Sequence, residues 1–351
     1  MEIHAITGWE ERAGLWHRPA MGPQAAPKYH ARGGPAVMMA VECFARHMSS
    51  EGWQLQDGLR AAGARLVGYG YDEALTNTPT ILEQYAPSVV VVQDQREWDA
   101  SKPGCFDKQA AFHATEALRE HDDVFCVTVI KDAHHDPTYT AANHCRMGVH
   151  AWLHYYHPAV ISRLAPWLRP EHMIRVHHTV SPDEIPPFVP GKNRDGCLLS
   201  GAVAAHWYPL RSRLWHAQLP HTDRWRHPGY HARGHHTPVF LRAMGGYKAA
   251  ICTTSIFGYA LRKIVEAVAC GCVPITDLPV ADVIPEVDPW LERVPFDISE
   301  GAMGDVIKRI IADYDEEYRR EGARVALERF DYRTEGRRVM SAIDELRNNY
   351  G

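Results

Sequence analysis

Apolar residues in this chain gather in short runs that alternate with amphipathic stretches, a pattern that predicts alternating strands and helices. Two of the runs, Ser88–Gln93 and Phe125–Lys131, are dominated by β-branched residues. Such runs are typical of parallel strands that are covered on both faces. In the first half, further strands are predicted at residues 2–7, 64–69, 149–155 and 173–177, and helices at 55–62 and 108–120.

The stretch that follows Gly33 and Gly34 is predicted to be another helix. Val37, Val41 and Phe44 have nearly helical spacing there, and a proline such as Pro35 is favoured at the first position of a helix. This helix would place a glycine turn at its N-terminus.

The segment 183–195 is rich in proline and shows no periodicity, so it is predicted to be a linker. After it, strands are predicted at 196–201, 247–253 and 273–276, and helices at 209–217, 260–269, 302–327 and 334–348. This alternation predicts an α/β protein with two Rossmann-like, doubly wound domains, 1–182 and 196–332, that face each other across a cleft. Ligands of such sheets bind at the carboxyl ends of the strands.

The composition narrows the range of partners and compartments. The 351 residues carry a formal net charge of −5 and include 22 histidines, so no global positive field draws the chain to nucleic acid. No stretch reaches the roughly 18–20 apolar residues that span a bilayer, and no signal peptide is visible. The eight cysteines include no Cys-x-x-Cys pair, which predicts reduced thiols in a cytoplasmic protein.

The most specific pattern lies between a predicted strand and a predicted helix, at residues 255–271. Lys263 and Glu266 are three residues apart there, so they share one helical face. A cation and backbone N–H groups near a helix N-terminus suit a phosphate, while a carboxylate suits ribose hydroxyls. The spacing alone equally allows a solvated ion pair between the two side chains.

This segment resembles the donor-binding motif of the GT-B glycosyltransferases, especially that of CgeB-like proteins and group 1 glycosyltransferases. The matching positions are Ser255, Phe257, Gly258, Tyr259, Leu261, Lys263, Glu266, Ala269 and Gly271. The resemblance implies that Gly258, Tyr259, Lys263 and Glu266 bind a nucleotide-sugar donor. Many retaining members carry a second acid eight residues before the glutamate, where this chain has Gly258, so a retaining mechanism is not implied.

Two shorter segments strengthen the resemblance. Gly201 at the end of a predicted strand and Arg211 beyond it resemble the first strand, the glycine turn and the diphosphate-binding arginine of the second GT-B domain. A guanidinium can grip phosphate with two parallel hydrogen bonds. His227 and Tyr230 lie in a His-Pro-Gly-Tyr element that recurs in the CgeB-like group, and they are assigned to the donor site by this resemblance.

The first domain offers a glycine loop and a candidate base. Gly33 and Gly34 resemble the loop that approaches the donor in GT-B proteins. Asp132 directly follows a predicted strand and is the candidate that takes the proton from an acceptor hydroxyl. The phage DNA β-glucosyltransferases, which this chain resembles more distantly, place their catalytic aspartate after the corresponding strand. Asp94 and Asp136 are rivals, and an N-cap is the alternative role of Asp132.

No metal site is expected. The adjacent histidines at 134–135, 177–178 and 235–236 lack a third ligand at a supporting spacing, and the cations that bind the diphosphate take the place of a metal. Asp313-Tyr314-Asp315 lies in a charged run that is predicted to be a solvated helical face.

A basic, aromatic stretch between Arg211 and His236 admits two interpretations. Arginines interleaved with tryptophan and tyrosine could track phosphates and stack bases of a nucleic acid. The favoured interpretation is that one or two of these cations hold the donor diphosphate and that the others line the cleft.

The sequence therefore predicts a cytoplasmic, metal-independent glycosyltransferase without a cofactor. It would move a sugar from a nucleoside-diphosphate donor, a UDP-sugar, to an acceptor hydroxyl on a glycan, a cell surface or a small molecule. The alternatives are a phage-type DNA glycosyltransferase that acts on a hydroxymethylated base, and a non-transferring sugar-nucleotide binder or epimerase. The resemblance also implies that the last helix, 333–351, packs back on the first domain.

Overall fold

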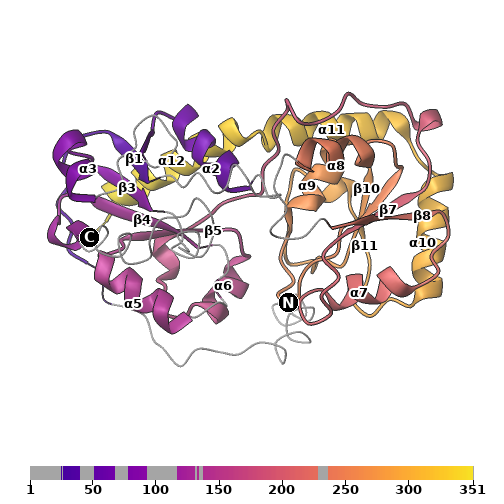
Figure 1. Ribbon diagram of the computed structural model, residues 1–351, viewed down its shortest axis with the longest axis horizontal. Coiled ribbons are helices and arrows are strands. Elements are labelled where there is room, and N and C mark those ends of the chain that lie inside the picture. The colour runs from indigo at the N-terminus through magenta and orange to yellow at the C-terminus, as the bar shows by residue number, and fades with distance from the viewer. Residues whose placement is uncertain are drawn as a thin grey trace. The chain divides into compact units, whose positions relative to one another are not determined.

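The structure is a computed structural model that describes residues 25, 27–39, 51–67, 78–92, 117–130, 133, 137–227 and 236–350. The chain forms two compact units (Figure 1). Of the described residues, those from 178 to 331 belong to the C-terminal unit, and those before residue 178 or after residue 331 belong to the N-terminal unit. Each unit contains one parallel sheet, so the predicted α/β class is confirmed.

The sheet of the N-terminal unit has six parallel strands in the order β2-β1-β3-β4-β5-β6. The strands are β1 (Ala36–Met39), β2 (Arg65–Val67), β3 (Val89–Val92), β4 (Phe125–Ile130), β5 (Ala151–His154) and β6 (Met173–Arg175). Every residue of β3 and β4 is buried. Their continuous apolar runs therefore reflect strands that are covered on both faces.

The helix predicted to begin at Pro35 is wrong over residues 36–39, which form β1 between β2 and β3. Val37 is completely buried and pairs with Val90. Periodicity cannot separate a short buried strand from the start of a helix, and here pairing with two neighbouring strands decides for the strand. The strand predicted at 2–7 lies outside the described residues. Of the helix predicted at 108–120, only 117–120 is described, as a 3₁₀ helix.

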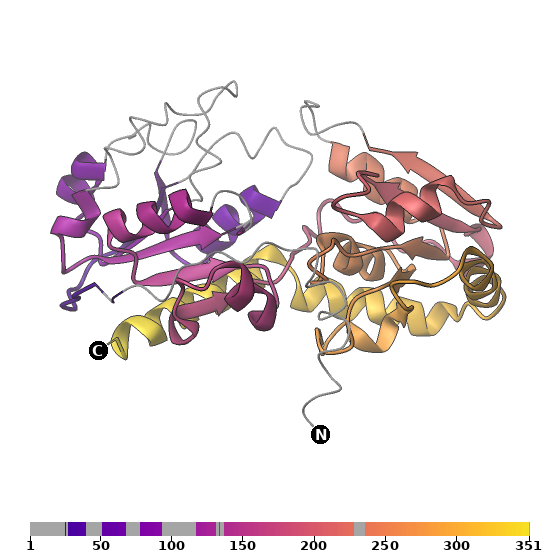
Figure 2. The same ribbon diagram turned by 90° about the horizontal axis from the view of Figure 1, so that it is seen from below.

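The last helix, α12 (Tyr332–Asn348), belongs to the N-terminal unit and packs on α2 (Glu51–Ala61). Figure 2 shows it running along one face of the six-stranded sheet, where Val339 and Ile343 join the core around Phe125. A Cβ on Gly336 would overlap the backbone of Gly58, so glycine allows the two helices to approach closely. The other helices of this unit are α3 (Thr78–Tyr85), α5 (Pro137–Met147) and α6 (Pro158–Leu164).

Glu335 fastens the start of α12 to the end of β6. The carboxylate is buried and accepts hydrogen bonds from the His177 backbone N–H at 2.7 Å and from Arg338 at 2.6 Å. Burial alone would raise the pKa of Glu335, but the bonds from Arg338 and His177 outweigh it and lower this pKa to about 2. The anchor therefore remains charged at any physiological pH.

Two buried histidines are expected to make the N-terminal unit unstable in acid. Burial and then Arg175 lower the pKa of His154 to about 3, and burial lowers that of His150 to about 4. An unfolded histidine titrates near pH 6.5, so the unfolded state binds more protons below that pH. The free energy of unfolding, measured with urea, should therefore fall by up to about 3 kcal/mol per histidine from about pH 7 to about pH 4.

An exposed histidine provides the control for this acid effect. His30 belongs to the same unit, and its side chain is 75% exposed. His154→Gln should make the pH dependence of unfolding shallower, and by more than His30→Gln, which removes an exposed imidazole. A wild-type free energy of unfolding that is constant over this pH range would contradict the expectation.

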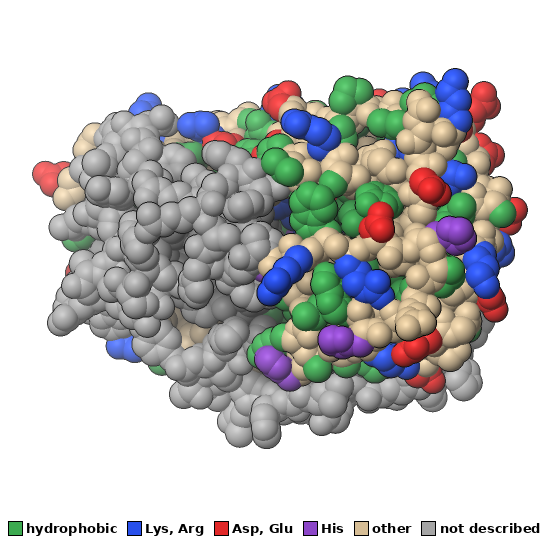
Figure 3. All heavy atoms as spheres, turned by 45° about the vertical axis from the view of Figure 1, so that its right-hand side comes forward, with side chains coloured by type: hydrophobic (Ala, Val, Ile, Leu, Met, Phe, Trp, Pro, Cys, Tyr) green, Lys and Arg blue, Asp and Glu red, His purple; other side chains and the backbone are tan. Residues whose placement is uncertain are grey.

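The sheet of the C-terminal unit has five parallel strands in the order β11-β10-β9-β7-β8. The strands are β7 (Cys197–Gly201), β8 (Thr222–Arg226), β9 (Ala249–Ile251), β10 (Val273–Thr276) and β11 (Glu292–Arg293). The helices are α7 (Pro209–His216), α8 (His236–Met244), α9 (Arg262–Ala269), α10 (Glu300–Ala312) and α11 (Glu316–Arg329). Basic and acidic side chains are interspersed on the coloured face of this unit that Figure 3 shows.

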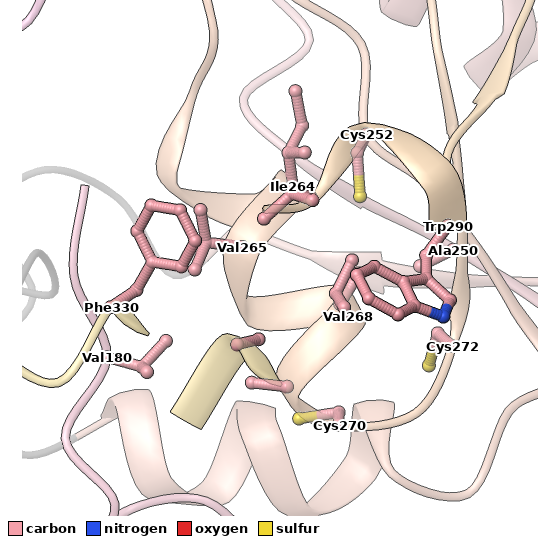
Figure 4. Close-up of a cluster of buried hydrophobic side chains, with 14 of the residues drawn as sticks. Val180, Ala250, Cys252, Ile264, Val265, Val268, Cys270, Cys272, Trp290 and Phe330 are labelled. Atoms are coloured by element: carbon pink, nitrogen blue, oxygen red, sulfur yellow. The ribbon is translucent and has the colours of Figure 1, made fainter. Parts of the chain in front are cut away.

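Two hydrophobic cores cover the two faces of this sheet, because alternate residues of each strand point to opposite sides. Leu198 and Ala250 face α8, α9 and α11, while Leu199 and Ile251 face α7 and α10. Figure 4 shows the first core, in which Ile264, Val265 and Val268 of α9 lie among Val180, Ala250, Cys252, Trp290 and Phe330. The apolar face of α9 thus holds this helix against the strands.

The single helix predicted at 302–327 is wrong, because the structure divides it into α10 and α11. Asp315 caps α11 by accepting a hydrogen bond from the Tyr318 N–H at 3.0 Å. Between the helices, the Tyr314 hydroxyl donates to the Gly271 carbonyl at 2.7 Å. Asp313-Tyr314-Asp315 is therefore a helix boundary and not a solvated helical face, since aspartate competes for backbone N–H groups.

The proline-rich segment 183–195 lies within the C-terminal unit, and the chain divides at 177/178 and 331/332. Arg194 stacks on Phe188 at 4.6 Å and donates to the carbonyls of Val189 and Tyr247. These contacts attach the segment to the unit, although it has no regular periodicity. None of the described helices is long and apolar enough to cross a membrane.

Candidate functional site

The carboxyl ends of the strands in the C-terminal unit meet where the strand order reverses. The chain runs from β7 to β8 on one side and then places β9 on the other side of β7. Ligands of parallel α/β sheets bind at such a reversal. Gly201, the last residue of β7, lies there with a φ of +108°.

Lys263 reaches from the first turn of α9 to the end of β7. Its Nζ donates a hydrogen bond to the Ser200 carbonyl at 2.8 Å, and a Cβ on Gly201 would overlap it. Burial and then the charge of Arg211 lower the pKa of Lys263 to about 7. About half of the Lys263 side chains therefore carry the charged ammonium form at neutral pH. An anion beside this side chain would favour the charged form.

Arg211 presents its guanidinium to the same point from α7. Its Nε and Nη2 donate to the Thr253 hydroxyl and carbonyl at 3.0 and 2.8 Å, and the guanidinium stacks on the Tyr208 ring at 4.1 Å. Nη1 donates to the Ala202 carbonyl and would lie 2.8 Å from a Cβ on Gly201. A side chain that is held on three sides loses little entropy on binding a ligand, so it is preorganised for an oxyanion.

His227 follows β8 and completes a group of three basic side chains. Burial, then Lys263, then Arg211 lower the pKa of His227, which places its ring within the field of both charges. We call Arg211, His227 and Lys263 the cation cluster. Its members come from three segments that are well separated along the chain.

The cation cluster has the electrostatic character of an anion site. The helices that supply Arg211 and Lys263, α7 and α9, have no acidic residue in their first turns. α9 instead begins with Arg262 and Lys263, whose charges oppose the positive end of the helix dipole. An oxyanion removes this penalty and the repulsion between Lys263 and Arg211, so a phosphate group matches the arrangement.

Glu266 pairs with Arg262 and not with Lys263. Its Oε1 accepts from Arg262 Nη2 at 2.7 Å, and both side chains are almost buried. The solvated pair between Lys263 and Glu266 that the spacing allowed is therefore not what the structure shows. Arg262 holds the carboxylate in place, while Lys263 is directed to the end of β7.

The loop 252–260, which leads into α9, is buried at every position. Gly258 has a φ of +63°, and its N–H donates to the Ser255 carbonyl at 3.0 Å. Tyr259 next to it is only 9% exposed. These two motif residues shape the entry to α9, because the turn at Gly258 requires the conformational freedom of glycine.

The sequence prediction missed two buried carboxylates that hold this loop. Asp277 accepts a hydrogen bond from the Thr254 N–H at 2.6 Å, and Asp282 accepts one from the Ala260 N–H at 2.9 Å. Asp277 directly follows a strand that the sequence did predict. Its position at the carboxyl end of that strand was the signal that could have identified it.

The structure does not place the site residues predicted in the first domain at the carboxyl end of a sheet. Gly33 and Gly34 precede β1 and so lie at the amino end of its sheet, where a Cβ on Gly34 would overlap the Ala86 carbonyl. No helix begins at Pro35, so the expected helix N-terminus is missing there. The remaining predicted residues, Asp94, Asp132, Asp136 and Tyr230, lie outside the described residues.

The basic, aromatic stretch from Arg211 to His236 does not form one surface over its described residues. Trp215 packs on the core that faces α7 and α10, whereas Trp225 packs on the opposite core. Arg213 donates to carbonyls at 296 and 297, and Arg224 donates to those of Trp215 and Ala217.

The histidine pairs do not assemble into a metal site within the described part of the chain. No three His, Cys, Asp or Glu side chains are grouped there so that they could hold an ion. His177 lies 3.3 Å from a Glu335 oxygen, in the anchor of α12.

Gly201→Ala is expected to disturb the cation cluster. The new methyl group would displace the Lys263 ammonium, and the positive φ would cost about 1–3 kcal/mol of stability. Thermal unfolding should occur at a lower temperature, and binding of a pyrophosphate ester, measured by calorimetry, should weaken. Gly301→Ala in α10 is the control, because a Cβ there meets no atom within 4 Å. Equal binding by Gly201→Ala and wild type would show that the close approach of Lys263 to Gly201 is unimportant for binding.

Comparisons with known proteins identify the fold. No protein-family model matches this sequence, and no curated protein matches it by sequence. A glycosyltransferase from Rickettsia africae matches with a TM-score of 0.54 and 10% identity over 91% of this chain and 100% of its own. Sucrose-phosphate synthase from Thermosynechococcus elongatus matches with a TM-score of 0.59 and 12% identity over 90% of this chain and 100% of its own.

HepE from Anabaena, solved in complex with UDP-glucose, matches with a TM-score of 0.52 and 12% identity, covering 90% of this chain and 100% of its own. These structures span both units of this chain. The similarity shows that the chain has the fold of the GT-B glycosyltransferases, as the sequence motif implied.

Proposed function

We propose that this chain, which has a GT-B fold, is a glycosyltransferase that moves a sugar from a nucleoside-diphosphate donor to an acceptor hydroxyl. The observation that carries the proposal is the convergence of Arg211 and Lys263 on Gly201, at the strand reversal of the C-terminal unit. Two cations beside a glycine, next to the beginnings of two helices, suit a diphosphate. The sequence motif from Ser255 to Gly271 supports the same assignment.

The donor would bind with its diphosphate at the cation cluster. The missing side chain at Gly201 lets the phosphate oxygens approach the backbone and both cations. Glu266 would accept hydrogen bonds from the ribose hydroxyls, while Arg262 holds its Oε1. His227, Gly258 and Tyr259 would border the donor, and HepE with its bound UDP-glucose supports a UDP-sugar as that donor.

The transfer would proceed by attack of the acceptor oxygen on the anomeric carbon of the sugar. Asp132, two residues after β4, is the proposed base that takes the proton from the acceptor hydroxyl. As the new bond forms, the bond from the anomeric carbon to the β-phosphate oxygen breaks, and that oxygen keeps the electron pair. Lys263 and Arg211 would stabilise the negative charge that develops on the departing diphosphate.

The test is incubation of the protein with a panel of UDP-, GDP- and TDP-sugars, with and without acceptors of the glycan, small-molecule and hydroxymethylated-DNA classes. Release of the nucleoside diphosphate together with glycosylated acceptor, detected by mass spectrometry, is the expected result. Binding without release or transfer from any donor would favour a sugar-nucleotide binder. Interconversion of the donor sugar without loss of the nucleotide would favour an epimerase.

A further inference from the structure

We infer that Asp282 and Arg293 are positioning residues for the cation cluster, which they serve by holding the beginning of α9, and with it Lys263, against the end of β7. The inference rests on the proposed function, because it concerns the same donor site. It follows from a continuous series of hydrogen bonds from β11 to α9.

The first link is between Asp282 and the entry to α9. The Asp282 carboxylate is completely buried and accepts a hydrogen bond from the Ala260 N–H at 2.9 Å. Ala260 lies two residues before the first residue of α9, and the N-cap residue Leu261 makes no side-chain capping bond. Asp282 therefore fixes, from another loop, the residue that precedes the N-cap of α9.

The second link fixes the other end of the same loop. Asp277 accepts hydrogen bonds from the Thr254 N–H at 2.6 Å and from the Thr254 hydroxyl at 3.2 Å. Asp277 and Asp282 both belong to the segment that follows β10. The loop from Thr254 to Ala260 is thus held at both ends by one segment, so that segment determines where α9 begins.

The third link holds the segment after β10. Arg293 of β11 donates to the carbonyls of Leu278, Pro279 and Asp282 at 2.6, 2.9 and 3.1 Å. It also contacts both oxygens of Asp288 at 2.8 and 3.0 Å. The Asp288 carboxylate holds the Arg293 guanidinium in place. The guanidinium in turn donates hydrogen bonds to three backbone carbonyls of the segment after β10.

The three links make the position of Lys263 dependent on a residue in the edge strand. Arg293 places Asp282, Asp282 places Ala260, and Lys263 follows three residues later at 2.8 Å from the Ser200 carbonyl. A displacement of about 1 Å in a group that contacts the reacting part of a substrate can reduce the rate about 100-fold. The effect of losing Arg293 should therefore appear at the donor site.

The experiment compares full-length Arg293→Gln and Asp282→Ala with wild type in UDP-glucose affinity and in the titration of Lys263, followed by NMR with labelled lysine. Both variants should bind UDP-glucose about 10-fold more weakly. Their Lys263 should titrate at a higher pH than in wild type, because it leaves its buried place beside Arg211. Asp282→Asn keeps a carbonyl oxygen for the Ala260 N–H and should restore most of the affinity.

Glu292→Gln is the matched control. Glu292 precedes Arg293 in β11 and pairs with Arg309 at 2.8 Å, but this pair is partly exposed and lies outside the three links. The variant should retain wild-type affinity and Lys263 titration. Circular dichroism identifies any variant that does not fold. If Asp282→Ala is one of them, Arg293→Gln and Asp282→Asn decide the question.

The outcomes separate this inference from the proposed function. If Arg293→Gln keeps both wild-type affinity and an unchanged titration of Lys263, the inference is overturned. It is also overturned if Glu292→Gln produces the same changes, because these would then follow from any disturbance of β11. If wild type binds no nucleoside-diphosphate sugar, the proposed function fails, while the Lys263 titration still tests the positioning.

Discussion

Lys263→Met is expected to weaken binding of a UDP-sugar about 100-fold, because the positive charge that would face the proposed diphosphate is lost. Methionine retains most of the apolar stem, so the packing beside Phe240, whose ring lies 5.9 Å from Nζ, changes little. Isothermal titration calorimetry with the wild type and the variant measures the difference. A loss of less than about twofold would remove Lys263 from the donor site.

The matched control is Lys248→Met in the same unit. The Lys248 ammonium also donates to a backbone carbonyl, that of Ile311 at 2.9 Å. Lys248 precedes β9, however, and therefore lies at the amino end of the sheet, away from Gly201. This variant should retain full affinity for the donor, so loss of a hydrogen-bonded lysine alone would not imitate the effect.

The pH dependence of wild-type binding gives a second signature of Lys263. With a pKa of about 7, about a tenth of the free protein carries the protonated form at about pH 8 and most of it does at about pH 6. Donor affinity should therefore rise about tenfold as the pH falls through this range, provided that the protonated form binds. A UDP-sugar is the proper probe because both of its phosphates are esterified. Lys263→Arg, which keeps its charge, should abolish most of this dependence.

Asp132→Asn is expected to lower kcat for sugar transfer about 10²–10⁴-fold, because the amide cannot take the proton of the acceptor hydroxyl. Donor affinity should remain within about twofold of wild type, since the proposed diphosphate contacts come from the other unit. Transfer is measured as glycosylated acceptor, and donor affinity by calorimetry on the same preparation. A parallel loss of both would indicate a structural role.

Asp94→Asn and Asp136→Asn test the two other candidates for the base. Both residues belong to the segments that follow buried strands β3 and β4, and both are rivals for the same role. If Asp132→Asn retains transfer and one of these variants does not, the base is that rival. If all three variants retain transfer, a different group accepts the proton.

Much of the fold follows from local sequence. The strands at 89–92, 125–130, 197–201 and 273–276 have apolar runs that can only be satisfied by burial on both faces. The helix after Leu261 has its apolar residues on one side, and the motif that contains it was identified from nine positions in order. Short elements were predicted less well: Ala36–Met39 contains too few residues for its period to be defined.

The sequence did not predict which side chains of the site contact one another, because these contacts join segments that are distant along the chain. The spacing of Lys263 and Glu266 predicted a shared face, yet the structure directs Lys263 to Gly201 and pairs Glu266 with Arg262. Asp282 and Arg293 belong to no motif, and their role appears only in the hydrogen bonds that they make. The Gly33-Gly34 pair has the right composition for a ligand loop but lies at the wrong end of its sheet.

The sequence by itself thus determined the α/β class, the parallel strands and the segment that supplies Lys263, because periodicity and a local motif encode these features within one stretch of chain. Only the tertiary structure decided that Gly201, Arg211 and Lys263 meet and that His227 lies in the field of both cations. The order of strands brings these residues together at one reversal, and strand order is set by packing across the whole sheet.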